Sequence, residues 1–122
     1  MNCLLISNPI NDKDDIVAFL TSNHIEYEWA NDQLIGIQKA HQNKFDVVVL
    51  EANQSEYPID RAIQIFKDCN PKVRIIVRTD MNSRELETQV RKAHIYYYHV
   101  NSFGSKEFNT ALSSALEMNK TH

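Results

Sequence analysis

Short groups of polar residues follow the apolar runs of this sequence, and their side chains are the ones equipped for chemistry. The groups comprise Ser7, Asn8, Glu51, Thr79, Asp80, Asn101 and Ser102. Mg²⁺ is bound by oxygen ligands, carboxylates above all, and a well-aligned carboxylate can accept a phosphoryl group. Whether these side chains act together depends on the elements that carry them.

Several other chemistries are excluded by residue type or spacing. The sequence has only two glycines, Gly36 and Gly104, which excludes a P-loop and a dinucleotide-binding fingerprint. No two histidines have H-x-x-x-H spacing, and Cys3 and Cys69 do not form a CxxC motif. We expect the two cysteines to be free thiols in a reducing compartment.

The composition is that of one globular domain, which we place over residues 1–122. Hydrophobic residues make up 43% and charged residues 24% of the 122 residues. The net charge of −3, with no continuous basic stripe, argues against direct binding to nucleic acid. No apolar run approaches the length of a signal peptide or membrane span. We therefore expect a cytoplasmic protein with neither a membrane nor a nucleic-acid partner.

Hydrophobic patterning predicts strands alternating with helices. The strand-like runs are residues 4–6, 25–29, 47–50, 73–77 and 95–100. The helix-spaced apolar positions that follow them are Ile16, Phe19, Leu20, Leu34, Ile37, His41 (a polar member of the same spacing), Ile59, Ala62, Ile63, Phe66, Leu86, Val90, Ala93, Phe108, Leu112, Ala115 and Leu116. Strict alternation requires mostly parallel strands joined by right-handed crossovers. The prediction is an α/β, flavodoxin-like (βα)5 fold, a three-layer doubly wound sheet of strand order 2-1-3-4-5.

Local signals place one edge strand and two helix ends. Residues 25–29 alternate apolar and acidic side chains, which is typical of an edge strand and predicts that Trp29 lies far from the other strand ends. Asn70 and Pro71 end the third helix. Asn82, three residues before Glu85, predicts a capping box at the start of the fourth helix.

In such a sheet, ligands bind where the carboxyl ends of the strands meet, next to the reversal of strand order. We therefore expect the polar groups above to form one polar mouth. Asp12, Asp14 and Asp15 follow the first strand, and either add acidic ligands or simply favour the N-terminus of a helix. Asp80 likewise either rims the site or opens the next loop.

Three segments resemble the receiver domain of bacterial response regulators, a CheY-like domain, and the similarity covers nearly the whole chain. Residues 45–51 look like the third strand, which normally ends in the phosphoacceptor aspartate. Residues 75–79 resemble the fourth strand, with Thr79 as its terminal switch residue. Residues 96–103 are similar to the fifth strand and its Lys-Pro-Phe turn, with Tyr98 at the position of the switch aromatic.

The same resemblance exposes departures at the ionic positions. Ser7 and Asn8 stand where family members have two acidic residues that help to hold Mg²⁺. Glu51 replaces the acceptor aspartate, Asn101 the lysine that pairs with the phosphoryl group, and Ser102 the proline after it. The chain therefore resembles a degenerate, atypical member of the family.

These departures weaken phosphoryl transfer for physical reasons. The reaction needs an aligned carboxylate, Mg²⁺ and a cation that neutralises the transferring group. Glu51 is one methylene longer than aspartate, and a displacement of about 1 Å costs on the order of 100-fold in rate. We expect no cofactor, weak or absent Mg²⁺ binding, no physiological phosphorylation and no enzymatic activity.

Three interpretations of Glu51 stay open at this point. It either mimics the phosphorylated state by accepting a hydrogen bond from Thr79, is an inert solvated carboxylate, or meets an unforeseen ligand.

Receivers commonly bind partners or dimerise through helix 4, strand 5 and helix 5. The resemblance places a candidate partner surface there, made of Arg84, Glu87, Arg91, Lys92, His99 and Lys106. Mixed charges at helical spacing are also typical of a solvated face. Between two symmetric copies they would form intermolecular salt bridges.

The resemblance implies a phosphorylation-independent interaction or dimerisation module in signal transduction, which regulates by docking onto a protein partner. One alternative is a working phosphoreceiver with unusual acidic ligands. Another is a small α/β ligand-binding domain or enzyme. The partner, the pathway, the oligomeric state and membership in a longer multidomain regulator are left open.

Overall fold

The computed structural model describes residues 1–7, 13–52 and 58–117, and within them the expected alternation of strands and helices is confirmed. The elements are β1 (Asn2–Ile6), α1 (Lys13–Ser22), β2 (Glu26–Ala30), α2 (Gln33–Gln42), β3 (Val47–Glu51), α3 (Ile59–Cys69), β4 (Arg74–Thr79), α4 (Arg84–Lys92), β5 (Tyr97–Val100), a 3₁₀ turn η2 (Asn101–Phe103) and α5 (Ser105–Ala115). The strands form one parallel sheet of order β2-β1-β3-β4-β5. The predicted fold class, strand order and edge position of β2 are therefore correct.

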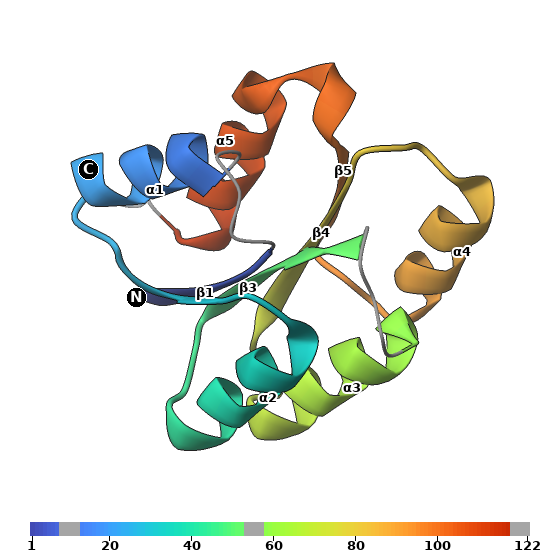
Figure 1. The fold of residues 1–122 in the computed structure, drawn as a ribbon, viewed down its shortest axis with the longest axis horizontal. Helices are drawn as coiled ribbons and strands as arrows, with labels where there is room; N and C mark the ends of the chain where they lie inside the picture. Colours follow the sequence, from blue (N-terminus) through green and yellow to red (C-terminus); the bar gives the residue numbers. More distant parts are fainter. Residues whose placement is uncertain (8–12, 53–57, 118–122) are drawn as a thin grey trace.

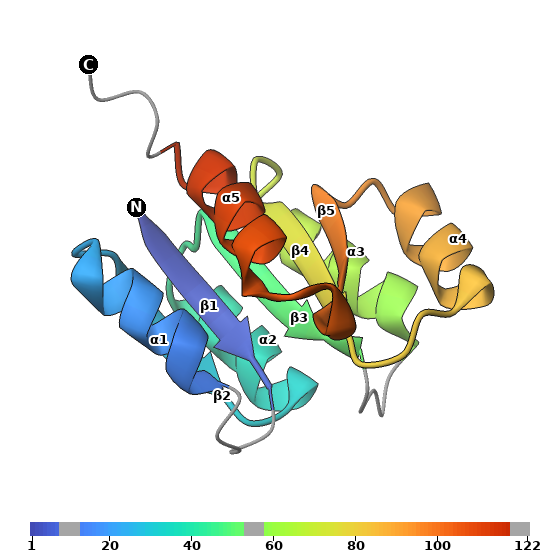
Figure 2. The same cartoon turned by 90° about the horizontal axis from the view of Figure 1, so that it is seen from above.

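Helices cover both faces of this sheet (Figure 1). Helices α1 and α5 lie on one face and turn toward the viewer in Figure 2, whereas α2 and α3 lie on the other. Successive strand residues point to opposite faces, so Val49 packs in the cluster with Leu112 of α5, while Leu50 packs in the cluster with Phe66 of α3. Each face thus has its own apolar core, and β3 is buried on both sides.

The packing face of α2 differs from the prediction. Leu34 is 48% exposed and His41 is also exposed, whereas Gly36 is buried. A Cβ at Gly36 would lie 2.5 Å from Ile6 Cδ1, so the missing side chain is what lets α2 approach β1 closely. The periodic pattern was misleading here because the closest contact is made by a residue without a side chain.

The helix ends were predicted within one residue. Helix α3 ends at Cys69, and the side chain of the following Asn70 donates a hydrogen bond to the Phe45 carbonyl at 2.8 Å. The N-cap of α4 is Ser83 rather than Asn82, because the Ser83 hydroxyl accepts the backbone N–H of Leu86 at 3.2 Å.

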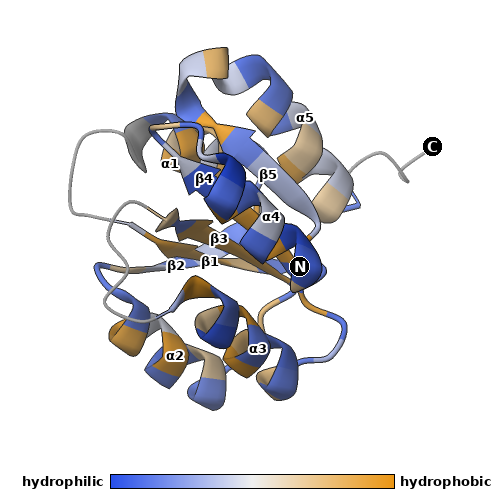
Figure 3. Ribbon diagram, turned by 90° about the vertical axis from the view of Figure 1, so that its right-hand side faces the viewer, coloured by the Kyte–Doolittle hydropathy of each residue, from blue (hydrophilic) through white to orange (hydrophobic). Residues whose placement is uncertain are grey.

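Helix α4 is the least apolar helix of the fold, and it appears mostly blue in Figure 3. It packs beside α3 and β5, and Val90 is its only fully buried residue within the described chain. No helix within residues 1–7, 13–52 and 58–117 is long and apolar enough to cross a membrane. Cys3 is buried in β1, Cys69 lies at the end of α3, and both thiols are free, as expected.

Candidate functional site

An ion pair occupies the carboxyl ends of β3 and β4. Glu51 is the last residue of β3, and Arg78 is its partner in the register of the two strands. Partners in a parallel register point to the same face of a sheet, and here Arg78 Nε lies 3.7 Å from Glu51 Oε1. The two side chains are only 15% and 16% exposed, respectively. The carboxylate predicted at this edge therefore faces a guanidinium instead of open solvent.

Arg78 also organises the neighbouring polar side chains. Its Nε donates a hydrogen bond to Asn101 Oδ1 at 3.1 Å, and Asn101 Nδ2 donates to Asp80 Oδ1 at 2.8 Å. The guanidinium lies over the ring of Phe108 in α5, 4.5 Å from its centroid, in cation–π geometry. One cation from β4 thus connects the ends of β3, β4 and β5.

Sequence reasoning missed Arg78 as a site residue, although a signal was present. It is the only charged side chain in the otherwise aliphatic run of residues 75–79. A cation within a strand that is buried on both faces requires a partner, and the nearest carboxylate at that edge is Glu51. The absence of a lysine at position 101 therefore does not leave Glu51 without a cation, because Arg78 supplies one.

The hydrogen bond from Thr79 to Glu51, which one of the three interpretations of Glu51 required, is not formed among the described residues, and Thr79 makes a local contact instead. Thr79 Oγ1 donates to the Met81 carbonyl at 3.0 Å and accepts the Met81 N–H at 3.3 Å. The buried hydroxyl thereby shapes the loop that leads from β4 toward α4. A hydroxyl has a single proton, and Thr79 donates that proton to the Met81 carbonyl within the loop and not to Glu51.

Trp29 lies at the mouth rather than far from it. Its indole Nε1 donates to the carbonyl and to the hydroxyl of Ser7, at 3.2 Å and 3.3 Å. The edge strand is correctly placed, but β2 runs directly beside β1, so its last residues end next to Ser7. Trp29 is therefore a fluorescent reporter of this site.

The acidic residues after β1 are described only in part. Asn8 and Asp12 lie outside the described residues, as does the side chain of Asp14. Asp15 is exposed on α1, next to a cavity of about 550 Å³ that Arg78 and Asp80 also line. Among the described side chains, no group of three His, Cys, Asp or Glu residues is arranged to hold a metal ion.

Tyr98 and His99 point to opposite faces of β5. Tyr98 is 8% exposed in the core on the side of α3, and its buried hydroxyl has no hydrogen-bond partner among the described residues. His99 is 2% exposed and lies 5.3 Å from the ring of Phe108. The placement of His99 on an exposed partner surface is therefore wrong, because the alternation of β5 turns it under α5.

The environment of His99 favours its neutral form. Burial lowers the pKa of the imidazole, and the nearby Arg78 charge lowers it further, while Glu107 and the Gly104 backbone act in the opposite direction.

The other charged residues of the predicted partner surface lie on the outside of α4 and α5. Arg84, Arg91, Lys92 and Lys106 are exposed, and Glu87 is half-buried. Arg91 Nε donates to Glu87 Oε2 at 2.8 Å within α4, an (i, i+4) pair typical of a solvated helix face.

Comparison with known proteins decides the fold. No family model and no curated protein sequence matches the chain. Among solved structures, a two-component response regulator from Clostridium difficile superposes with a TM-score of 0.85 at 16% identity, covering 99% of each chain. The chain has the receiver-domain fold. The beryllofluoride-activated NtrC4 receiver domain dimer (NtrC4 is from Aquifex aeolicus) matches with a TM-score of 0.84 at 19% identity, covering 96% of this chain and 97% of that one.

A third structure with the receiver fold carries a phosphoryl group. It is a response regulator from Burkholderia pseudomallei with a phosphorylated aspartic acid, a calcium ion and citrate, at a TM-score of 0.80 and 19% identity, covering 97% of this chain and 70% of that one. In this chain, Ser7, Glu51, Thr79 and Asn101 lie at the carboxyl ends of β1, β3, β4 and β5. The structure gathers Glu51 and Asn101 around Arg78, while Thr79 bonds within its own loop. Their equivalence to acceptor, lysine and switch positions stays a prediction.

Proposed function

We propose that the chain is an atypical receiver domain of two-component signalling that acts through protein–protein contacts without being phosphorylated. The observation that carries this proposal is the pairing of Arg78 with Glu51. A nucleophilic carboxylate must be free to attack in line, whereas this one is held by a largely buried cation of its own chain. The domain is then a signalling module and not an enzyme.

The described residues fit a divalent cation poorly. Mg²⁺ needs several oxygen ligands in near-octahedral geometry, mostly from carboxylates and water. Here the Arg78 guanidinium stands beside Glu51, and Asp80 accepts a hydrogen bond from Asn101. A metal ion at this edge would have to displace Arg78, or it would be repelled at short range by the positive charge of the guanidinium. We therefore propose that the domain works without Mg²⁺.

Protein contacts remain the means of action. The exposed charges of α4 and α5, with Arg91 and Lys106 among them, support a docking or dimerisation face. The matched NtrC4 receiver domain is a dimer in its beryllofluoride-activated form, and we extend dimerisation to this chain as part of the proposal. Sedimentation velocity tests it: the wild-type chain is expected to be a dimer and Arg91→Glu a monomer. A dimer that survives the reversal would place the interface elsewhere.

Trp29 fluorescence tests independence from metal and phosphate directly. Wild-type protein is titrated with Mg²⁺ and then with beryllofluoride, and no saturable change is expected, because neither reaches Glu51. The matched control is a variant that restores the family pattern: Ser7→Asp, Asn8→Asp, Glu51→Asp, Asn101→Lys and Arg78→Leu. That variant is expected to give a saturable change. Saturable quenching in the wild type would overturn the proposal.

A further inference from the structure

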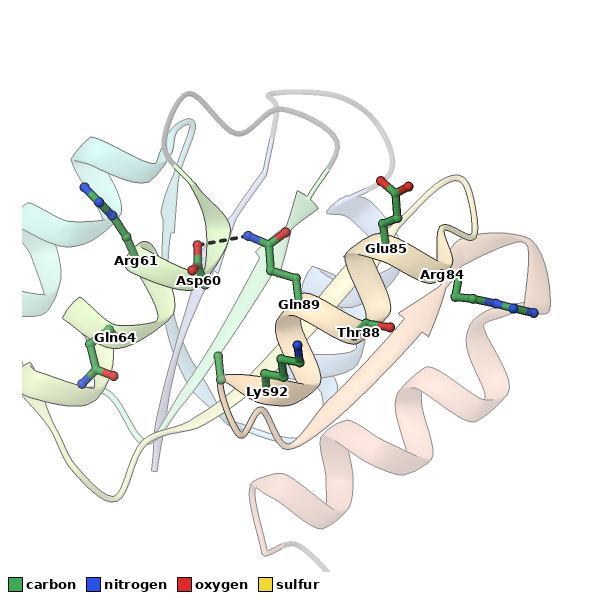
Figure 4. Close-up of a pocket in the computed structure, with 9 residues that line it drawn as sticks. Asp60, Arg61, Gln64, Arg84, Glu85, Thr88, Gln89 and Lys92 are labelled. Atoms are coloured by element: carbon green, nitrogen blue, oxygen red, sulfur yellow. Dashed lines mark hydrogen bonds between the residues drawn. The ribbon is translucent and has the colours of Figure 1, made fainter.

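Helices α3 and α4 leave a groove of about 760 Å³ between them (Figure 4). Asp60, Arg61 and Gln64 of α3 form one wall, and Thr88, Gln89 and Lys92 of α4 form the other. The groove exists because the side of α4 that faces α3 carries polar residues. These cannot close against α3 as an apolar helix face would.

A hydrogen bond holds the two walls at a fixed spacing. Gln89 Nε2 donates to Asp60 Oδ1 at 3.0 Å, and Figure 4 shows this contact crossing from α4 to α3. Val90 anchors α4 from beneath, where it is fully buried against the core. The groove is therefore a preformed feature of the surface and does not require a rearrangement to open.

The charges around the groove are unbalanced. The side chains of Arg61, Arg84 and Lys92 make no ion pair or hydrogen bond with any residue that the structure describes. By contrast, the nearby Arg91 is paired with Glu87 within α4. In Figure 4, Arg61 points away from α4 and Arg84 points away from α3, so both lie at the outer rims of the groove, whereas Lys92 lies near its lower end.

The acidic residues of the groove do not offset these cations fully. The Asp60 carboxylate is already engaged by the Gln89 amide. Glu85 lies in the first turn of α4, where the N-terminal end of the helix stabilises a negative charge. The groove is lined by three cations and two carboxylates, so it carries a net charge of +1 on a chain whose net charge is −3.

We infer that the α3–α4 groove is a docking site for an acidic, amphipathic segment of a partner protein. The inference rests on the proposed function, and it names a partner chemistry and a second surface, which adjoins the outer face of α4 and α5 and shares Arg84 and Lys92 with it. Helix α4 is 9 residues long, which corresponds to about 13 Å, so two to three turns of a partner helix would lie along it. Carboxylates on the flanks of the segment would meet Lys92 and, at the rims, Arg61 and Arg84, and its apolar side would lie toward Ala93.

The test is an NMR titration of the full chain with a synthetic helical peptide of about four turns. The peptide carries Leu on one face and Glu on its flanks, and a second peptide carries Lys in place of every Glu. Amide shifts are expected in α3 and α4 with the acidic peptide and not with the basic one. Shifts spread over other faces, or equal shifts with both peptides, would overturn the inference.

Matched charge reversals separate the groove from general electrostatics. Arg61→Glu combined with Lys92→Glu is expected to weaken binding of the acidic peptide about tenfold or more. Lys44→Glu combined with Lys72→Glu makes the same change in net charge at exposed sites elsewhere and is expected to leave binding within about twofold. Equal losses in both double variants would contradict a specific groove.

Two further outcomes are informative. Concentration-dependent shifts in α3 and α4 without peptide would show that a second copy of the chain occupies the groove, against the inference. Failure of the proposed function is separately visible, because it is read out as Mg²⁺- and beryllofluoride-dependent fluorescence of Trp29 in β2. Peptide binding that persists in such a phosphoreceiver would leave the groove assignment standing.

Discussion

Arg78 and Glu51 face each other from two neighbouring strands, with Arg78 Nε 3.7 Å from Glu51 Oε1. The two side chains are only 15% and 16% exposed to solvent. The pair has two consequences. It neutralises the carboxylate that ends β3, and through Asn101 it links the ends of three strands. The cation belongs to β4. The chain therefore neutralises the Glu51 carboxylate with its own side chain, whereas phosphoryl transfer needs the carboxylate free to attack.

Removing one member of this pair should destabilise the domain. Arg78→Gln removes the Arg78 countercharge from the largely buried Glu51 carboxylate, and we expect a loss of about 2–3 kcal/mol in the free energy of unfolding. Urea denaturation measures it. The double variant Glu51→Gln/Arg78→Gln should lose less than the sum of the two single variants, since no charge is then stranded.

The control for that experiment is an exposed pair. Arg91→Gln breaks the ion pair with Glu87 on α4, where the Arg91 side chain is 60% exposed. Its cost, measured at protein concentrations at which the chain is monomeric, should stay below about 0.5 kcal/mol, because solvent screens the interaction. Equal costs at Arg78 and Arg91 would contradict a structural role for the pair at the mouth.

Stability should fall in mild acid through His99. Burial lowers its pKa below 6.5, so the folded state favours neutral imidazole, whereas the unfolded chain takes up a proton near pH 6.5. As the pH falls below 6.5, unfolding therefore becomes easier, until the lowered pKa of the folded state is reached. We compare the urea midpoint about one pH unit above 6.5 with the midpoint about one unit below it. The midpoint of His99→Gln should fall less over this range than the midpoint of the wild type.

Carboxylates add their own pH dependence, so a second histidine variant serves as the reference. His24 is exposed and has a positive φ of 58°, a conformation that asparagine tolerates. His24→Asn is the matched control, because it removes an exposed histidine and leaves His99 in place. A profile flattened as much in His24→Asn as in His99→Gln would contradict the assignment.

The close approach of α2 to β1 should make Gly36 sensitive to added volume. Gly36→Ala places a Cβ 2.5 Å from Ile6 Cδ1, and overpacking of this kind costs about 1–3 kcal/mol, against a gain in helix propensity of about 1 kcal/mol. We expect a net loss of stability in thermal unfolding. Ile6→Val removes Cδ1, so the double variant Gly36→Ala/Ile6→Val should be more stable than the sum of the two single changes. Simple additivity would show that the Cδ1 atom of Ile6 is not the obstacle.

The two thiols should differ in reactivity. Burial in β1 raises the pKa of Cys3 to about 12, so it has almost no thiolate at neutral pH and no access to reagent. A disulfide reagent should therefore label one thiol of the native protein, and labelling of Cys3 should follow the rate of unfolding. In Cys69→Ser protein the fast phase should vanish. Rapid labelling of Cys3 in that variant would show that β1 opens locally.

The fold was predictable because its signals repeat along the chain. Apolar runs alternate with helix-spaced residues, and burial of Ile63 and Phe66 in α3 and of Leu112 in α5 follows the expected period. The errors occur where tertiary contact overrides the period. In α2, Gly36 is buried at the contact that Leu34 was expected to make. In β5, the alternation of side chains places His99 beneath α5.

The site was predictable in position but not in its interactions. Glu51, Thr79 and Asn101 were assigned to the carboxyl edge from strand order alone, and they lie there. The role of Arg78 was not apparent, because a strand residue is assigned to a partner only when the register of two strands is known. Trp29 was misplaced for the same reason, since its contact with Ser7 depends on how β2 pairs with β1.

The central claim is that Glu51 does not accept a phosphoryl group while Arg78 holds it. Intact-mass spectrometry after incubation with acetyl phosphate and Mg²⁺ tests it most directly. We predict that wild-type protein keeps its mass, whereas a variant with Glu51→Asp, Arg78→Leu, Asn101→Lys and both acids restored at Ser7 and Asn8 gains one phosphoryl increment. A phosphoryl increment on the wild type that disappears in Glu51→Gln would contradict the account.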